Sequence, residues 1–141
     1  MKKLLFLFLV LMGFTEIATA QVFAEPWTAK QLMETQTLAR KINQNQNLAI
    51  ISVGPDAVIK NSFAAKPASE PENIQNLKSY LQNVSKDKEV VIYCGCCPFE
   101  KCPNIRPAFK LLKELGYKNA RLLNIPKNIK VDWIDKGYPT K

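Results

Sequence analysis

The architecture of this chain follows from Val90-Val91-Ile92-Tyr93-Cys94-Gly95-Cys96-Cys97-Pro98-Phe99-Glu100-Lys101-Cys102-Pro103, which contains all four of its cysteines. The apolar, β-branched start predicts a buried strand, and the Gly and Pro residues that follow predict a loop. Open α/β sheets bind their ligands beyond the carboxyl ends of the strands, which is where this loop is expected. The chain has no histidine, so the most common general base and metal ligand is absent. Any chemistry at this site therefore depends on sulfur.

The first twenty residues have the pattern of a cleavable export signal. Lys2-Lys3 form its charged start, residues 4–14 its apolar core, and Ala18-Thr19-Ala20 its cleavage site. The apolar core is too short to cross a bilayer, which takes about 20 residues. We therefore expect a signal peptide over residues 1–20 and a mature domain over residues 21–141, with an uncleaved anchor as the alternative. The expected location is periplasmic or otherwise secreted, with no stable membrane anchor after cleavage.

The chain is basic, with 20 Lys and Arg against 12 Asp and Glu and a net charge of +8. In a cytosolic protein this charge would suggest nucleic acid, but export argues against that partner. A basic surface in an exported protein instead favours small anions or an anionic membrane face, or serves solubility alone.

Alternating strand and helix patterns predict a single α/β domain, with a central parallel sheet flanked by helices on both faces. The first helix is expected from Thr28, because Thr28 and Gln31 have capping-box spacing. Residues 61–70 are expected to form a loop. Further helices are expected to begin at Ser69-Glu70-Pro71 and near Asn104, and strands are expected over residues 48–53, 58–59, 90–93 and 120–125.

Cys94 is the candidate nucleophile of the cysteine loop, because it sits where the predicted strand ends. A loop that leads into a helix N-terminus collects backbone N–H groups without helical partners. These groups favour an anion and lower the pKa of a cysteine below its free value of ~8.5. Arg106, in the first turn of the next helix, is a candidate ligand for an oxyanion, with an ordinary solvated arginine as the alternative.

These residues resemble the rhodanese (sulfurtransferase) family, over a span from about Trp27 to Pro139. The strongest part is the strand ending in Tyr93-Cys94, the loop, and the helix that ends in Gly116-Tyr117-Lys118-Asn119. The resemblance implies a rhodanese-like domain in which Cys94 takes a sulfane sulfur from a small anionic donor, becomes a persulfide and passes the sulfur to a thiol or cyanide. It implies no cofactor and no metal, and leaves any protein partner unknown. The substrate-binding residues it implies are Gly95, Cys96, Cys97, Asn104 and Arg106.

Three features depart from the family pattern. The helix is expected near Asn104, about ten residues after Cys94, whereas the family's helix follows its cysteine after about five. The longer loop brings in three further cysteines, which are candidates for an internal sulfur acceptor or for a disulfide that shapes the loop. These are Cys96, Cys97 and Cys102. The family's Asp-x-Arg after the first central strand is replaced by Ser52-Val53-Gly54.

A thiol–disulfide oxidoreductase is one alternative function. Cys94 and Cys97 form a C-x-x-C after an apolar strand, and Ile125-Pro126 is a candidate for the proline that faces such a site. However, Pro98 interrupts the helix that should follow, and no antiparallel hairpin is predicted after Pro126.

A soft-metal-binding module is the second alternative. Four thiolates within one loop suit Cu(I) or Zn(II). However, the spacing C-x-C-C-x4-C differs from the paired C-x2-C of structural zinc sites. Adjacent Cys96 and Cys97 are also expected to point their side chains apart.

Overall fold

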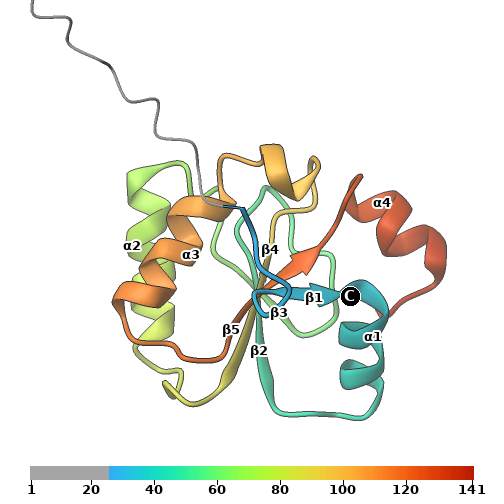
Figure 1. Cartoon of the computed structure of the whole chain (residues 1–141), viewed down its shortest axis with the longest axis horizontal. Coiled ribbons are helices and arrows are strands. Elements are labelled where there is room, and N and C mark those ends of the chain that lie inside the picture. The colour runs from blue at the N-terminus through green and yellow to red at the C-terminus, as the bar shows by residue number, and fades with distance from the viewer. Residues whose placement is uncertain (1–25) are drawn as a thin grey trace, which may run out of the picture.

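Within residues 26–141, the part of the chain that the structure describes, five parallel strands form one sheet (Figure 1). The structure is a computed structural model, and the predicted signal peptide lies outside the described residues. The strand order is β1-β5-β4-β2-β3, and all four neighbouring pairs run parallel. The predicted single α/β domain with a central parallel sheet is therefore confirmed. The elements are β1 (Leu32–Glu34), α1 (Thr35–Asn43), β2 (Leu48–Ser52), β3 (Ser62–Ala64), α2 (Pro71–Leu81), β4 (Glu89–Tyr93), η1 (Phe99–Lys101), α3 (Ile105–Glu114), β5 (Ala120–Asn124), α4 (Ile129–Asp132) and η2 (Ile134–Lys136).

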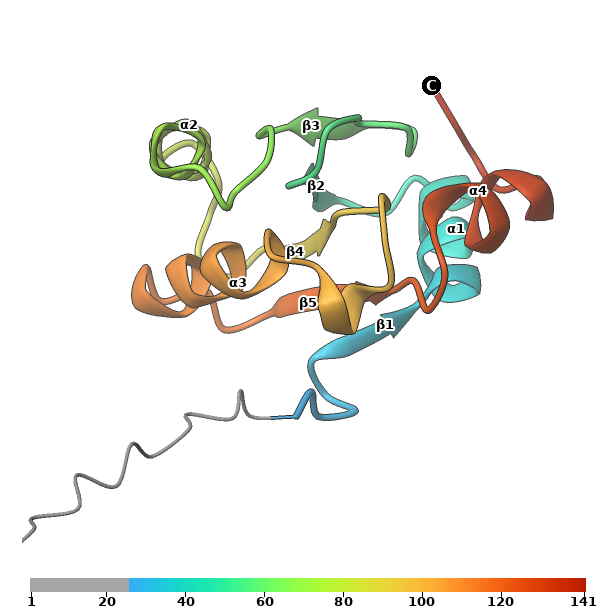
Figure 2. The ribbon, with the colours of Figure 1, turned by 90° about the horizontal axis from the view of Figure 1, so that it is seen from above.

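Strand β4 lies at the centre of the sheet, and its side chains enter two separate buried clusters. Ile92 belongs to the cluster formed with α2 and α3. Tyr93, the next residue, belongs to the cluster formed with α1 and Trp133. Figure 2 shows α2 and α3 on one side of the strands, and α1 and α4 on the other. Successive side chains of a strand point to opposite faces, so β4 is apolar throughout because both of its faces are buried.

Helices α2 and α3 begin where the sequence predicted them. Helix α2 begins at Pro71, and its Leu77 is fully buried. Helix α3 begins at Ile105, directly after Asn104. Gly116 follows the end of α3 with φ of +82°, a left-handed conformation that glycine adopts without strain. Because α3 begins at Ile105, the cysteine loop that precedes it ends at Asn104.

The predicted start of the first helix, at Thr28, is wrong. The predicted capping pair does form, because the Thr28 backbone N–H donates to Gln31 Oε1 at 2.9 Å, but it closes a turn. Leu32–Glu34 then pair with β5 as strand β1, and α1 begins only at Thr35. Pairing with a strand distant in sequence thus overrides the local helix signal.

The strand expected over residues 58–59 is also wrong. Ile59 makes an isolated antiparallel bridge with Thr140, and the next strand is β3, inside the segment predicted as a loop. The Ser62 hydroxyl lies 3.0 Å from the Tyr93 hydroxyl. The backbone N–H of Ile59 donates to the same tyrosine oxygen at 3.1 Å. The buried Tyr93 therefore ties the edge of the sheet to the end of β4.

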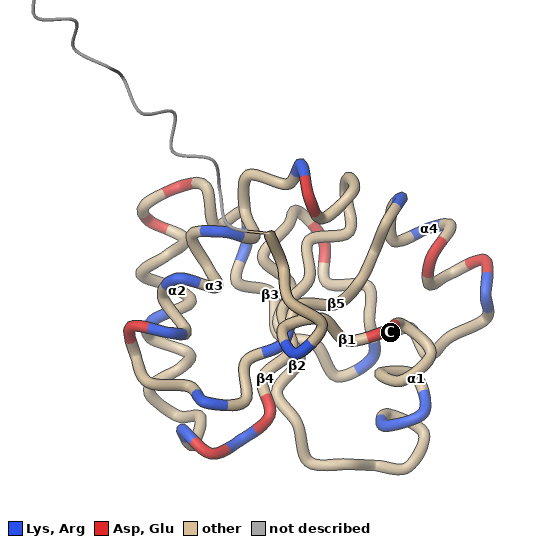
Figure 3. The backbone as a smooth tube through the Cα atoms, viewed as in Figure 1, with Lys and Arg blue, Asp and Glu red and all other residues tan. Residues whose placement is uncertain are grey.

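Charged residues of both signs are interspersed along the helices and turns (Figure 3). This distribution fits a surface whose charge serves solubility. Among residues 26–141, no helix has the length and apolar character needed to cross a membrane.

Candidate functional site

Cys94 lies buried immediately beyond the end of β4, beside the segment that follows β2. Ser52 and Tyr93 are aligned in the register of these two strands, so their extensions run side by side. A Cβ atom at Gly54 would lie 2.5 Å from the Cys94 carbonyl oxygen and 2.8 Å from Cys94 Sγ. Only a residue without a side chain therefore fits at position 54. Sequence reasoning did not place Gly54 in the site, although a glycine after a central strand was an available signal.

Gly95 turns the chain away from the sheet. Its φ of +85° lies in the left-handed region. Its carbonyl accepts a hydrogen bond from the Ile129 backbone N–H at 2.8 Å, and a Cβ atom on Gly95 would lie 2.8 Å from Ile129 Cβ. The conformation of Gly95, one of the predicted substrate-binding residues, is therefore fixed by its own backbone geometry and by Ile129.

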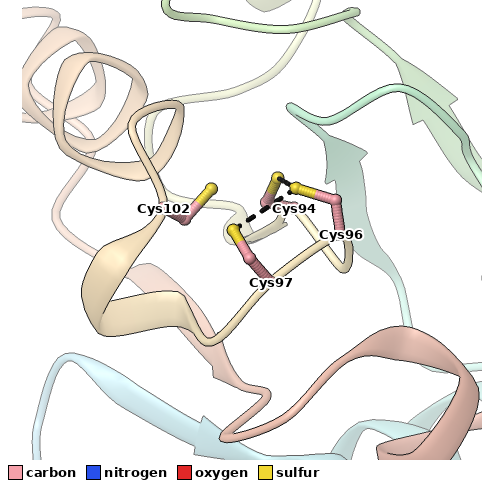
Figure 4. A group of neighbouring side chains, drawn as sticks. All are labelled: Cys94, Cys96, Cys97 and Cys102. Atoms are coloured by element: carbon pink, nitrogen blue, oxygen red, sulfur yellow. Dashed lines mark hydrogen bonds between the residues drawn. The ribbon is translucent and has the colours of Figure 1, made fainter.

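The four cysteine sulfurs point toward one another (Figure 4). Cys96 Sγ lies 3.2 Å from Cys94 Sγ and 3.4 Å from Cys97 Sγ. All four sulfur atoms, including that of Cys102, lie within 4.8 Å of one another. The expectation that Cys96 and Cys97 point apart is wrong, because the turn around Gly95 brings both sulfurs over Cys94. All four residues are free thiols, so the structure describes the reduced state of the loop.

The four thiols differ in exposure. Cys94 and Cys102 are buried, Cys97 is half-buried and Cys96 is exposed. Helix η1 spans the segment between Cys97 and Cys102, and the Phe99 backbone N–H donates to the Ile125 carbonyl at 3.2 Å. The loop is thus attached to the end of β5, and its sulfurs are reached from solvent through Cys96.

Asn104 connects the start of α3 to the cysteine. Its side chain is buried and does not cap its own helix. Asn104 Oδ1 accepts a hydrogen bond from the Ser69 backbone N–H at 2.9 Å. This contact turns the amide nitrogen toward Cys94 Sγ, to which it donates at 3.4 Å. The predicted role of Asn104 as a site residue agrees with this position.

Hydrogen bonds onto its sulfur lower the pKa of Cys94 to about 5. The largest contribution comes from the Cys102 thiol, followed by the Asn104 amide and by the backbone and side chain of Cys96, while burial acts in the opposite direction. Burial and the hydrogen bonds to Cys94 and Cys97 raise the pKa of Cys96 to about 12. The pKa of Cys102 is also raised, mainly because its thiol donates to Cys94. Cys94 is therefore the favoured thiolate, and the thiols of Cys96 and Cys102 are held protonated beside it.

Arg106 lies elsewhere on α3. Its guanidinium carbon is 4.1 Å from the centre of the Trp27 ring, which in turn packs edge-on against Phe109. Arg106 and Trp27 line a groove of about 470 Å³ whose lining includes none of the four cysteines. The predicted role of Arg106 as an anion ligand of the cysteine loop gains no support from this position.

Comparisons of the chain with protein-family models, with curated proteins and with solved structures find no match. The function of the site must therefore be argued from its own geometry: a buried thiolate, its donors, and three further thiols within reach.

Proposed function

We propose that the chain is an exported, rhodanese-like sulfurtransferase in which Cys94 carries a sulfane sulfur as a persulfide. The observation that supports this most is the placement of Cys94 Sγ, fixed beyond the central strand and receiving the Asn104 amide donor at 3.4 Å. A lowered pKa keeps this sulfur ionised at neutral pH, and the thiolate is the nucleophilic form of cysteine. The proposal of export rests on residues 1–20.

The first half of the proposed reaction loads the cysteine. The Cys94 thiolate attacks the outer sulfur of a thiosulfate-like donor and forms a new S–S bond. The bond within the donor breaks, and sulfite leaves with the electron pair. Asn104 and the backbone N–H of Cys96 already donate to the Cys94 sulfur. The same donors would stabilise the negative charge of the persulfide.

The second half returns the thiolate. A nucleophilic acceptor, cyanide or a thiolate, attacks the outer sulfur of the persulfide, and the S–S bond breaks with its electrons on Cys94. Cyanide leaves as thiocyanate. The stabilised Cys94 thiolate is a good leaving group because thiols of low pKa leave faster. An acceptor must enter from the side of Cys96, which is the exposed member of the cluster.

The oxidoreductase alternative is less well supported. The C-x-x-C pair of Cys94 and Cys97 is present, but the described sheet has only parallel strands. After β5 the described chain forms α4, η2 and a single bridge at Thr140, instead of the antiparallel hairpin that the alternative requires.

The test is the intact mass of the reduced protein before and after thiosulfate. The wild type is expected to gain the mass of one sulfur atom and to lose it again with cyanide. Cys94→Ser is expected to gain nothing, whereas Glu100→Gln, a substitution in the same loop that leaves every sulfur in place, is expected to load normally. Loading that persists in Cys94→Ser, or no loading of the folded wild type, would falsify the proposal.

A further inference from the structure

We propose that the four cysteines also form a tetrathiolate site for one thiophilic d10 metal ion, with Zn(II) as its simplest occupant. The ligands are Cys94, Cys96, Cys97 and Cys102. This inference goes beyond sulfur transfer and departs from the expectation that the site lacks a metal. It rests on the positions of the four sulfur atoms in the described part of the chain.

The separations of the sulfurs suit a single ion. A Zn–S distance of about 2.3 Å in a tetrahedron requires sulfurs about 3.8 Å apart. All four sulfurs lie within 4.8 Å of one another; Cys96 Sγ lies 3.2 Å from Cys94 Sγ and 3.4 Å from Cys97 Sγ. Side-chain shifts of less than about 1 Å would therefore bring the four into a tetrahedron. An iron–sulfur cluster would need its ligands further apart, because several irons would lie between them.

The spacing objection from the sequence does not hold in three dimensions. The paired C-x2-C pattern normally turns the chain so that two sulfurs converge. Here Gly95, with φ of +85°, supplies that turn between Cys94 and Cys96. Helix η1 supplies a second turn and returns the chain to Cys102. The sulfurs of the adjacent Cys96 and Cys97 therefore both lie in the same four-sulfur cluster.

The hydrogen bonds and the burial around the sulfurs also suit a bound metal ion. The Asn104 amide donates to Cys94 Sγ and is itself fixed by Ser69. Such outer hydrogen bonds orient thiolate ligands and reduce their charge. Two sulfurs are buried and one is exposed, so an ion has an entry path and a dry interior side. Because Cys94 would be coordinated, metal binding and sulfur loading exclude each other.

The experiment is an anaerobic titration of the reduced chain with Zn(II) against a chromophoric chelator, followed by X-ray absorption of the zinc-loaded protein. We expect one Zn(II) per chain and four sulfur neighbours at about 2.3 Å. Cys97→Ser and Cys96→Ser alter the two less buried ligands, so each variant should keep the fold. Circular dichroism checks that each variant is folded. Each is expected to weaken zinc binding by more than about 100-fold, since even outer-shell losses cost about 10- to 100-fold.

Glu100→Gln is the matched control, because it removes the one carboxylate between Cys94 and Asn104 and leaves every sulfur in place. It is expected to bind zinc as the wild type does. Affinity that survives Cys97→Ser, oxygen ligands in the absorption spectrum, or loss of binding in Glu100→Gln would overturn the tetrathiolate site. None of these readouts depends on sulfur transfer, so the two proposals fail separately.

Discussion

Asn104 Nδ2 donates to Cys94 Sγ at 3.4 Å, and the same side chain accepts from the Ser69 backbone N–H at 2.9 Å. The amide therefore has only one orientation that satisfies both neighbours. Since Asn104 immediately precedes α3, the helix boundary places a hydrogen-bond donor on the proposed nucleophile. The long loop between them is closed by this contact.

Asn104→Asp should raise the pKa of Cys94. The carboxylate still accepts from Ser69, but it replaces a donor to the thiolate by a second negative charge, which favours the protonated thiol. We expect an increase of about one pH unit or more. The pH dependence of Cys94 alkylation, followed by peptide mass spectrometry, measures it. Asn83→Asp, which adds the same charge at an exposed position, should leave the profile unchanged. An unchanged profile in Asn104→Asp would exclude Asn104 as the donor.

The reduced, metal-free protein should become more stable as pH rises from about 5 to about 8.5. The folded Cys94 has a pKa of about 5, whereas an unfolded cysteine has a pKa of ~8.5. In that window the unfolded chain binds the extra proton, so stability rises with pH, by at most about 1.4 kcal/mol per pH unit. Above it the trend should reverse, because folding keeps Cys96 and Cys102 protonated.

Urea unfolding between pH 5.5 and 9.5 measures this dependence. The chain has no histidine, so few other groups titrate in the lower part of this range. Cys94→Ser lacks the titrating thiol and should lose most of the rise. A rise of equal slope in Cys94→Ser would assign the effect to another group.

Gly54→Ala should disturb the nucleophile directly. The new methyl carbon would lie 2.5 Å from the Cys94 carbonyl oxygen and 2.8 Å from its sulfur. Overpacking of this kind costs about 1–3 kcal/mol, and it should slow sulfur loading because the sulfur must shift. Gly116→Ala is the contrast, because a Cβ there meets nothing within 4 Å but φ is +82°. It should lower stability and leave the alkylation profile of Cys94 unchanged. Normal loading by Gly54→Ala would show that the contact does not constrain the site.

Much of the fold was predictable because its signals are local. The apolar runs of β2, β4 and β5 and the periodicity of α2 and α3 each predict their element without knowledge of the rest. Strand β1 was missed because it exists only through pairing with β5. The capping pair of Thr28 and Gln31 is real but ends in a turn. Strand β3 was missed for the same reason, since it depends on β2.

The site was predictable in its residues and not in its geometry. Clustering in sequence identified the four cysteines, and the helix boundary identified Asn104. The contact of Gly54 with Cys94 follows from the parallel register of β2 and β4, which no local pattern contains. The convergence of the Cys96 and Cys97 sulfurs depends on the left-handed turn at Gly95. The contact between the Arg106 guanidinium and the Trp27 ring joins residues far apart in the sequence, and no residue spacing predicts it.

Zinc should prevent sulfur loading if one set of sulfurs serves both proposals. Cys94 bound to a metal has no free thiolate with which to attack a donor. We expect one equivalent of Zn(II) to reduce the mass gain from thiosulfate by more than about tenfold. The gain that remains should come from the fraction of protein that has no metal bound. A chelator should restore loading. Cys97→Ser is the decisive variant, because it lacks the fourth ligand but keeps Cys94. Its sulfur loading should be the same with and without this amount of zinc. If zinc inhibits Cys97→Ser as strongly as the wild type, the metal acts at Cys94 without the tetrathiolate site. If wild type with bound zinc still loads sulfur, Cys94 is not among the metal's ligands.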